Sequence, residues 1–256
     1  MLTHLIEVLI GLAMVAALTG VAGMASAWAL MRGLKGWPVI IAASLSAAAV
    51  LAVWLLSDNH WDAASAWGAV EKYLSTARDT EMSRWSKAGI QPANVEVFRH
   101  LYTQYIVLSF PAWLLLTCLV LGMFSSSLTA SLLSRATPGV ERFRPFKEWV
   151  IPEPLVFGFL VGCFLKLFRK EGIADHHLQN LTADNLLVFF MGLYTVGGLC
   201  VISHFFHKWR FPFMVRLLGY FLLFNLASMA AACFGILDIW FDFRKIKTSV
   251  PREVAS

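Results

Sequence analysis

Six long runs of apolar residues dominate this 256-residue chain, separated by short polar or basic connections. They are Leu5–Met31, Trp37–Leu56, Tyr105–Leu133, Ile151–Phe168, Leu186–Phe206 and Phe211–Phe243. A helix that rises 1.5 Å per residue needs about 20 apolar residues to cross the hydrocarbon core of a bilayer. The pattern therefore predicts an all-α, polytopic transmembrane helix bundle with about six spans.

The last run, Phe211–Phe243, has two possible paths. It is long enough for one tilted helix of about 50 Å, or for two short crossings with a turn near Asn225–Ser228. Six spans place both termini on one side of the membrane. Seven place the tail beside the strongly basic loops, which obeys the positive-inside rule better. Because no Gly or Pro marks the turn, we predict one helix and six spans, with seven as the alternative.

Residues 58–100 form the only sizeable polar segment, and its apolar residues recur at spacings of three and four, as in an amphipathic helix. These residues are Trp61, Ala64, Trp67, Val70, Tyr73 and Leu74. Tryptophan suits the membrane interface. A break at Ala88–Asn94 precedes a second helix, which is expected to run into the third span and to kink at Pro111. The chain is thus predicted to be one integral membrane domain, 1–256, with 58–100 as a polar amphipathic insert.

Small residues form pairs at four-residue spacing in the first span. They are Ala13, Ala16, Ala17, Gly20, Gly23 and Ala27. Such a face lets a second helix approach closely in lipid. We interpret it as a packing seam within this protein rather than a dimer interface.

Composition narrows the class of function. Apolar residues make up 58% of the chain and charged residues 14%, about half the share usual in soluble domains. The net charge of +5 fits basic loops near anionic headgroups, and without a clustered basic face it does not predict nucleic-acid binding. No hydrolase, metalloprotease, Walker A or dinucleotide motif occurs, so neither enzyme activity nor a cofactor is predicted. His204 and His207 lack a nearby carboxylate and are not predicted to bind metal.

Asp238 is the sharpest polar candidate, because ionisable residues at lipid depth are costly. It shares a helical face with Asp242 and lies six residues before Arg244. Asp238 either pairs with a basic group from another helix or loop, which would fix the last helix at the membrane edge, or provides a polar anchor for a ligand or partner subunit. Arg244 is a candidate with it.

Three further residues are candidates for ligand or partner contacts. Glu153 lies between two prolines at the start of a helix, where a negative charge interacts favourably with the helix dipole. Asn185 can tie helices together through its side-chain amide. Trp149 closes the basic, aromatic loop Arg135–Trp149.

Four motifs in the C-terminal part carry a resemblance to a known family. They are FPAWLLL (Phe110–Leu116), PFKEWVIPEPLVFGFL (Pro145–Leu160), NLLVFFMGLYTVGGL (Asn185–Leu199) and GILDIWFDFRK (Gly235–Lys245). Over roughly 95–247 the chain resembles the YybS-like family of uncharacterised bacterial multispanning membrane proteins. That family is distantly similar to the substrate-binding subunits of energy-coupling-factor transporters and to MreD-type cell-shape proteins. The resemblance implies a six-span bundle in the bacterial cytoplasmic membrane, but no particular substrate.

Two functions follow as hypotheses. The first is a membrane subunit of binding or transport type, which holds a small molecule and relies on a partner membrane subunit or ATPase for energy. The second is a structural or scaffolding membrane protein that recruits envelope partners through Arg135–Trp149 and the polar insert.

Overall fold

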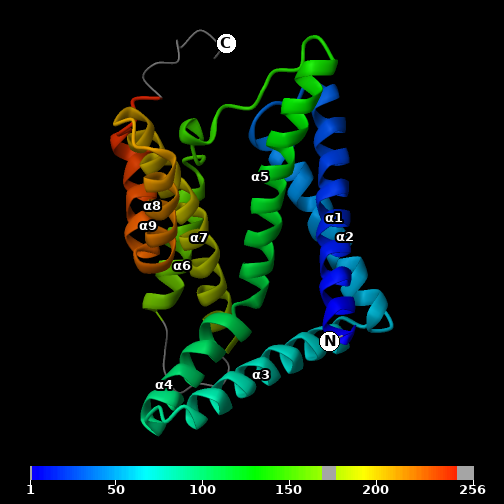
Figure 1. The fold of residues 1–256 in the computed structure, drawn as a ribbon, viewed down its shortest axis with the longest axis vertical. Helices are drawn as coiled ribbons and strands as arrows, with labels where there is room; N and C mark the ends of the chain where they lie inside the picture. The colour runs from blue at the N-terminus through cyan, green and yellow to red at the C-terminus, as the bar shows by residue number, and fades with distance from the viewer. Residues whose placement is uncertain (1, 169–176, 247–256) are drawn as a thin grey trace. The chain divides into compact units, whose positions relative to one another are not determined.

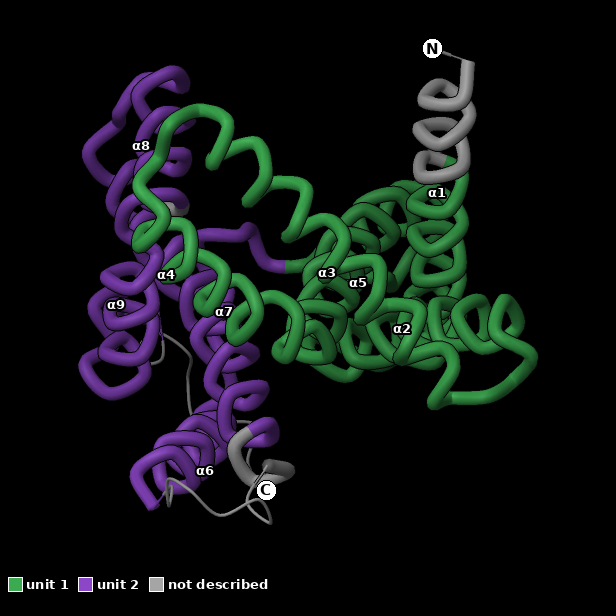
Figure 2. Tube along the Cα trace, turned by 90° about the horizontal axis from the view of Figure 1, so that it is seen from below, with its two compact units in different colours: residues 1–143 green, residues 144–256 purple. Residues whose placement is uncertain are grey.

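A computed structural model of the chain describes residues 2–168 and 177–246, and every regular element in these two ranges is helical (Figure 1). The chain divides into two compact units, Met1–Phe143 and Arg144–Ser256 (Figure 2). Each unit has its own set of packed helices. The single domain over 1–256 that the sequence suggests stays a prediction.

The first unit contains three long apolar helices and two shorter polar ones. Its elements are α1 (Leu2–Met31), α2 (Trp37–Asp58), α3 (Ala63–Lys87), α4 (Pro92–Tyr102), the π-helical turn η1 (Thr103–Val107) and α5 (Phe110–Ala136). The helices α1, α2 and α5 pack against one another in pairs. In Figure 1, α3 runs crosswise to α1 and α5. The expected insert between the second and third spans is therefore present as α3 and α4.

Small residues and hydroxyl groups hold α1, α2 and α5 together. The hydroxyl oxygens of Ser26 and Ser126 lie 3.0 Å apart, and Ser125 Oγ donates a hydrogen bond to the carbonyl of Thr19 at 3.0 Å. At Gly122 a Cβ would overlap the side chain of Ser44. Because lipid does not drive helices together by the hydrophobic effect, such close approach and interhelical hydrogen bonds are what stabilise the bundle.

The predicted packing seam of α1 is wrong for most of its residues, because a neighbouring face of the helix is the one that packs within this unit. The fully or nearly fully buried positions of α1 are Leu18, Ala22, Ser26, Ala29 and Leu30. Gly23 is half-buried against Ser125 and Thr129. Four of the predicted seam residues are instead exposed: Ala13, Ala16, Ala17 and Gly20. Spacing alone could not decide which of two adjacent small faces meets α5.

The amphipathic character of α3 is confirmed by its burial. Ala66 and Met82 are buried, and Trp67, Val70 and Leu74 are half-buried along the same face. The helix packs against α4 and η1. Three other residues of the predicted stripe, Trp61, Ala64 and Tyr73, are exposed.

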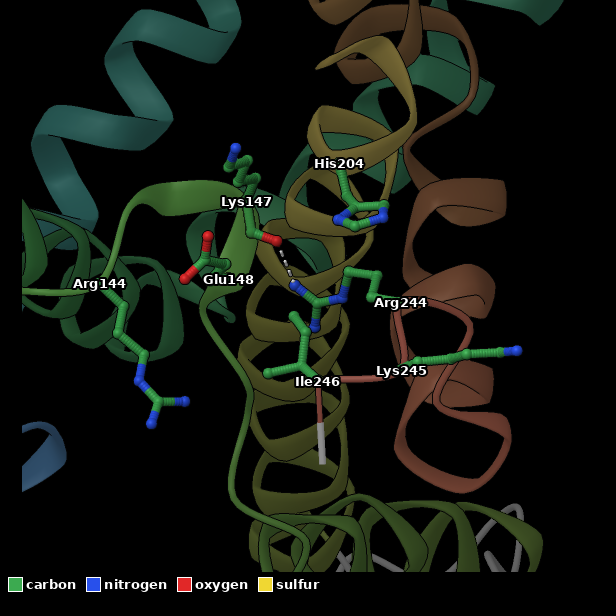
Figure 3. A pocket seen from close by; sticks show the side chains of 7 residues that line it. All are labelled: Arg144, Lys147, Glu148, His204, Arg244, Lys245 and Ile246. Atoms are coloured by element: carbon green, nitrogen blue, oxygen red, sulfur yellow. Dashed lines mark hydrogen bonds between the residues drawn. The ribbon is translucent and has the colours of Figure 1, made fainter. Parts of the chain in front are cut away.

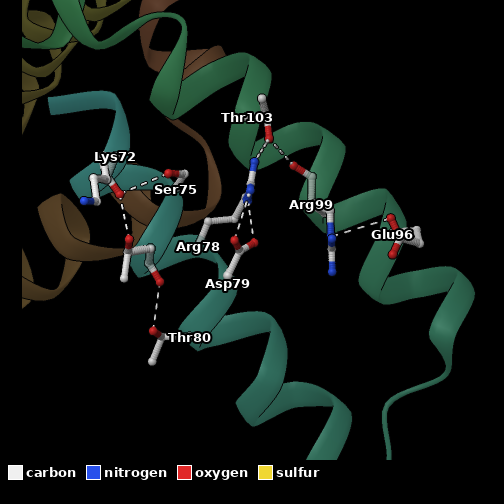
Figure 4. A network of polar contacts seen from close by, with 9 residues as sticks. Lys72, Ser75, Arg78, Asp79, Thr80, Glu96, Arg99 and Thr103 are labelled. Atoms are coloured by element: carbon white, nitrogen blue, oxygen red, sulfur yellow. Dashed lines mark hydrogen bonds and ion pairs between the residues drawn. The ribbon is translucent and has the colours of Figure 1, made fainter. Parts of the chain in front are cut away.

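A polar network fastens α3 to η1 (Figure 4). Arg78 Nη1 donates to Thr103 Oγ1 at 2.8 Å, while Arg78 Nε pairs with Asp79 Oδ1 at 2.9 Å. The hydrogen bond from Arg78 lowers the pKa of the Asp79 carboxyl. Thr103 Oγ1 in turn donates to the carbonyl of Arg99 in α4 at 2.9 Å. Within the insert, α3 is therefore joined to α4 and η1 by specific polar contacts as well as by apolar packing.

The path from the insert into the third span differs from the prediction. The second insert helix does not run on unbroken, because α4 ends at Tyr102 and the non-helical Ser109 separates η1 from α5. Pro111 occupies the first turn of α5 rather than kinking it. A proline is tolerated there because the first helical N–H groups have no intrahelical partner. Trp113 Nε1 donates to the carbonyl of Tyr105 at 2.8 Å and so holds η1 to α5.

Asp62 caps α3, and its protonation should weaken the helix. Its carboxylate accepts hydrogen bonds from Ser65 Oγ at 2.5 Å and from the backbone N–H groups of Ser65 and Ala64 at 3.0 and 3.2 Å. The bond from the Ser65 hydroxyl, followed by the two backbone bonds, lowers the pKa of Asp62 below its ordinary value of 3.8. A lowered folded-state pKa means that the cap stabilises α3 above about pH 4 and loses that effect as the pH falls through the folded-state pKa.

The test compares thermal unfolding midpoints of the wild type and Asp62→Asn between about pH 3 and pH 7, a range that spans the ordinary pKa of aspartate. Asparagine caps helices about as well as aspartate but does not titrate. We expect similar midpoints at neutral pH and a variant that becomes the more stable of the two at acidic pH. A difference between the two unfolding midpoints that stays constant across this pH range would contradict the role of the Asp62 carboxylate as the cap of α3. Asp62→Ala should be less stable than both at neutral pH.

The second unit begins with a short connection and contains four helices. Its elements are the 3₁₀ turn η2 (Phe146–Glu148), α6 (Leu155–Leu167), α7 (His177–Lys208), α8 (Phe213–Leu226) and α9 (Ser228–Phe241). The most extensive contact is between α7 and α9. No side chain could fit at their crossing, since a Cβ on Gly198 would overlap the carbonyl of Ala231 and one on Gly235 would overlap the carbonyl of Tyr194.

The prediction of one helix over Phe211–Phe243 is wrong. The chain leaves helical geometry at Ala227 (φ −135°, ψ 31°), and the axes of α8 and α9 turn by 99° there. The break falls within the Asn225–Ser228 turn of the two-crossing alternative. Contacts with α7 hold α9 beyond the break: Thr195 Oγ1 lies 3.3 Å from the carbonyl oxygen of Ser228, and Gly235 packs at Gly198.

The turn also decides where the chain goes next. Arg244 lies against Lys147 and lines a pocket together with His204, near the C-terminal end of α7. Residues 244–246 therefore share an end of this unit with Lys208, as the seven-span alternative predicted for the tail. Each of α8 and α9 has 14 residues, about 21 Å, which is less than the hydrocarbon core of about 30 Å.

The all-helical, multi-spanning architecture is confirmed. Four helices among the described residues are long and apolar enough to cross a membrane, or five if the α8–α9 pair counts as one span. The thirteen-residue apolar helix α6 is shorter. With α6 and the two short helices α8 and α9, the number of apolar segments stays near six, although α8 and α9 together return residues 244–246 to the C-terminal end of α7 instead of crossing once.

Candidate functional site: a basic pocket beside the Asp238–Arg244 ion pair

The segment that begins the second unit forms a compact turn held by its own hydrogen bond. After Pro145 it makes the single turn η2, and Trp149 Nε1 donates a hydrogen bond to the carbonyl of Arg144 at 2.6 Å. The rings of Phe146 and Trp149 meet edge to face, 5.6 Å apart. Ile151 then packs into the space beside Gly197 of α7 and is buried. The segment 144–149, which we term the strap, is thereby held against α7.

The C-terminal end of α9 brings Asp238 and Arg244 together. Asp242 adopts the left-handed conformation (φ 42°, ψ 55°), which ends the helix and turns the chain back. The Asp242 carboxylate accepts the N–H of Ile246 at 3.0 Å and holds this turn. Aspartate is among the few residues that tolerate this backbone geometry. The expectation that Asp238 and Asp242 act from one helical face is therefore wrong, because Asp242 shapes the turn instead.

Asp238 and Arg244 form a buried ion pair. Arg244 donates from Nη2 and Nε to Asp238 Oδ2 at 2.7 and 3.1 Å. The side chains of Arg244 and Asp238 are 3% and 7% exposed. The other carboxylate oxygen, Oδ1, is buried and has no hydrogen-bond partner among the described residues. Because the pair is buried this deeply, removing either side chain would leave the other charge buried without a partner and would strongly destabilise the protein.

Arg244 also joins α9 to the strap. Its Nη1 donates to the backbone carbonyl of Lys147 at 2.8 Å. The sequence expectation that Asp238 pairs with a basic group is confirmed, but the group comes from the same C-terminal segment rather than from another helix or loop. The contact with a distant element is made by the arginine.

A pocket of about 450 Å³ opens beside this pair (Figure 3). The strap, α7 and the segment after α9 line it with Arg144, Lys147, Glu148, His204, Arg244, Lys245 and Ile246. In Figure 3 the ring of His204 and the guanidinium of Arg244 come from neighbouring elements, while Arg144 and Lys147 extend from the strap. The lining holds four cationic side chains and a single carboxylate, that of Glu148. Because the charge of Arg244 is balanced by Asp238, the excess of positive charge comes from Arg144, Lys147 and Lys245, and the pocket is basic.

The five sequence candidates end up in different places. Arg244 lines the pocket, Asp238 holds Arg244, and Trp149 closes the strap. Glu153 is exposed two residues before α6, where its charge suits the helix start, and it does not line the pocket. Asn185 is half-buried on α7, and its side-chain amide donates to the carbonyl of Leu181 in the same helix at 2.9 Å.

Several residues that the structure brings together carry little signal in the sequence. The spacing of His204 and His207 suggests only a metal site, whereas His204 lines the pocket and His207 hydrogen-bonds the carbonyl of Ser203 in its own helix. A second ion pair, Lys166–Asp184, joins α6 to α7. A lysine inside the apolar run Ile151–Phe168 is the available signal for it, because charges at lipid depth are normally paired.

A comparison of the chain with models of known protein families finds one match. Residues 1–239 match the family model described as a predicted membrane protein, DUF2232. The chain belongs to this family. The DUF2232 match covers the first unit as well as most of the second, so it extends beyond the region of the YybS-like resemblance, which stays a prediction. Neither a curated protein nor a solved structure matches the chain.

Proposed function

We propose that this DUF2232 protein is a membrane subunit of binding or transport type, which holds a small molecule in the basic pocket of its second unit. The observation that carries the proposal is the pocket itself. Its volume of about 450 Å³ lies within the range of about 300–1,000 Å³ that is typical of small-molecule sites. Polar groups from three separate elements line it, and Arg244 is fixed in place by Asp238.

The proposal includes a partner that supplies energy. The sequence contains no nucleotide-binding motif, so work done on a bound molecule would have to come from an ATPase or from another membrane subunit. The proposed location is the bacterial cytoplasmic membrane, as the YybS-like resemblance implies. A non-enzymatic role belongs to the same proposal.

The experiment is native mass spectrometry of the full chain, purified with a tag in mild detergent. We expect a small molecule to be retained by the wild type and lost from the double variant Arg144→Ala/Lys147→Ala. Lys208→Ala is the matched control, because it removes a cation at the same end of α7 without changing a lining residue. Wild-type protein without any retained molecule, or equal retention in all three proteins, would contradict the proposal.

The scaffolding role is the second candidate, and one observation favours it. Val97, Leu101 and Tyr105 recur every four residues along α4 and η1, and all three are exposed. Such a stripe is typical of a helix face that meets a partner. Recovery of envelope proteins with the tagged chain, unchanged in the pocket variant and without a small molecule, would favour the scaffold.

A further inference from the structure

The pocket offers many hydrogen-bond donors and few acceptors. Among the described residues, the side chains of Arg144 and Lys147 have neither an ion pair nor a hydrogen-bond partner. The ring of His204 contacts that of Phe205 edge to face, and it has no hydrogen-bond partner in the described parts of the chain. Glu148 is the one carboxylate in the lining. The excess of cationic donors favours a ligand that is both anionic and rich in acceptor oxygens.

Arg244 is already oriented for such a ligand. A guanidinium carries five N–H groups, and three of those of Arg244 are used by Asp238 Oδ2 and by the carbonyl of Lys147. One N–H on each terminal nitrogen is left for a ligand. The ion pair fixes the plane of the group, so little side-chain entropy is left to lose when an oxyanion binds.

We propose that the pocket binds the phosphate group of an anionic ligand, with the fixed guanidinium of Arg244 as its anchor and Arg144, Lys147 and His204 as further donors in the lining. The inference rests on the proposed function and specifies the chemistry of the bound molecule. A phosphate offers three or more acceptor oxygens to donors that arrive from several sides, whereas a carboxylate offers two.

Two sources share this chemistry: a lipid headgroup and a water-soluble phosphate or phosphate ester. Exposed aromatic residues precede Arg244 along the chain, namely Trp240, Phe241 and Phe243. Tryptophan is enriched at the depth of lipid headgroups, so Trp240 is the one that points to this depth. Basic pockets at that depth are known to hold anionic headgroups. A free phosphate would use the same donors, so the experiment must separate the two.

The test measures binding by the full chain to two probes. Inorganic phosphate is titrated against sodium chloride at equal ionic strength, and the unfolding midpoint is recorded. In parallel, protein in nanodiscs of phosphatidylcholine alone is compared with protein in nanodiscs that also contain phosphatidylglycerol, and native mass spectrometry counts the retained phosphatidylglycerol. Lys147→Ala is the main variant, since Lys147 meets Arg244 through its backbone carbonyl and the ion pair should survive the change. Lys208→Ala is the control.

We expect Lys147→Ala and Arg144→Ala each to weaken binding about tenfold or more, the effect of losing one charge-assisted hydrogen bond. Weakened binding of inorganic phosphate, with or without phosphatidylglycerol, supports the inference with a soluble phosphate as source. Weakened binding of phosphatidylglycerol alone supports it with a lipid headgroup. Binding of neither probe, or equal weakening by Lys208→Ala, overturns it. Pocket-dependent retention of a molecule without phosphate also overturns it, while the proposed function would stand.

Discussion

Replacing Arg244 with alanine should lower the free energy of unfolding by about 3–5 kcal/mol, the usual result of removing one member of a buried ion pair. The carboxylate of Asp238 would be left buried without its cation, since Arg244 donates both hydrogen bonds to Asp238 Oδ2. The strap would also lose the donor that binds the carbonyl of Lys147. Asp238→Ala should have an effect of similar size, because it leaves the guanidinium unpaired. The measurement is equilibrium unfolding of the full chain in detergent.

The double variant Asp238→Leu/Arg244→Met removes both charges at once. It therefore distinguishes the cost of leaving one charge buried without its partner from the cost of losing the side-chain packing. With no charge left buried, apolar residues of similar volume can be neutral or even stabilising. We therefore expect the double variant to recover much of the stability lost in each single variant, although the contact with Lys147 is gone. Single variants as stable as the wild type would show that the pair does not hold the end of α9. Exposed Lys35–Glu141, in the first unit, is a matched control pair that should contribute little.

A methyl group at the crossing of α7 and α9 should be as damaging as the loss of the ion pair. Gly198→Ala would place a Cβ on the backbone carbonyl of Ala231, and Gly235→Ala would place one on the carbonyl of Tyr194. Backbone cannot move aside by changing rotamer, so the two helices must separate. We expect a loss of about 3 kcal/mol or more, at or above the upper end of the usual range of about 1–3 kcal/mol for overpacking.

Gly68→Ala provides a control of opposite sign for this substitution. Gly68 lies within α3, and a Cβ there would meet nothing within 4 Å. Because alanine favours a helix more than glycine, this variant should be stabilised by about 0.5–1 kcal/mol. Unfolding midpoints of the three variants, measured under the same conditions, give the answer. A wild-type midpoint for Gly198→Ala would rule out the close approach of α7 and α9.

The periodicity of the insert could be predicted because its partners are local. Trp67, Val70 and Leu74 repeat at helical spacing, and the helix meets α4, its neighbour in sequence. In contrast, no local signal distinguishes an exposed small face of α1 from the one that meets α5. Gly20 and Ala22 are both small residues in the same apolar run, yet Gly20 is exposed and Ala22 is fully buried.

The site could be predicted only in part. Asp238 and Arg244 stand out because charges near apolar runs are costly, and only six positions separate them. Nothing in the sequence shows that a left-handed residue at Asp242 brings them together. The pocket depends on the strap, on His204 and on residues 244–246, segments that are far apart in sequence.

The sequence by itself determined the all-helical, multi-spanning class and the polar insert, because an apolar run of about 20 residues crosses lipid with its backbone groups satisfied as a helix. Only the tertiary structure decided the path of the last apolar run and hence the site. Two glycines let α7 and α9 approach closely, and this close packing goes with a turn at Ala227, where no Gly or Pro marks one. Arg244 is thereby returned to the strap and His204, since close packing between distant segments outweighs the helical preference of any one segment.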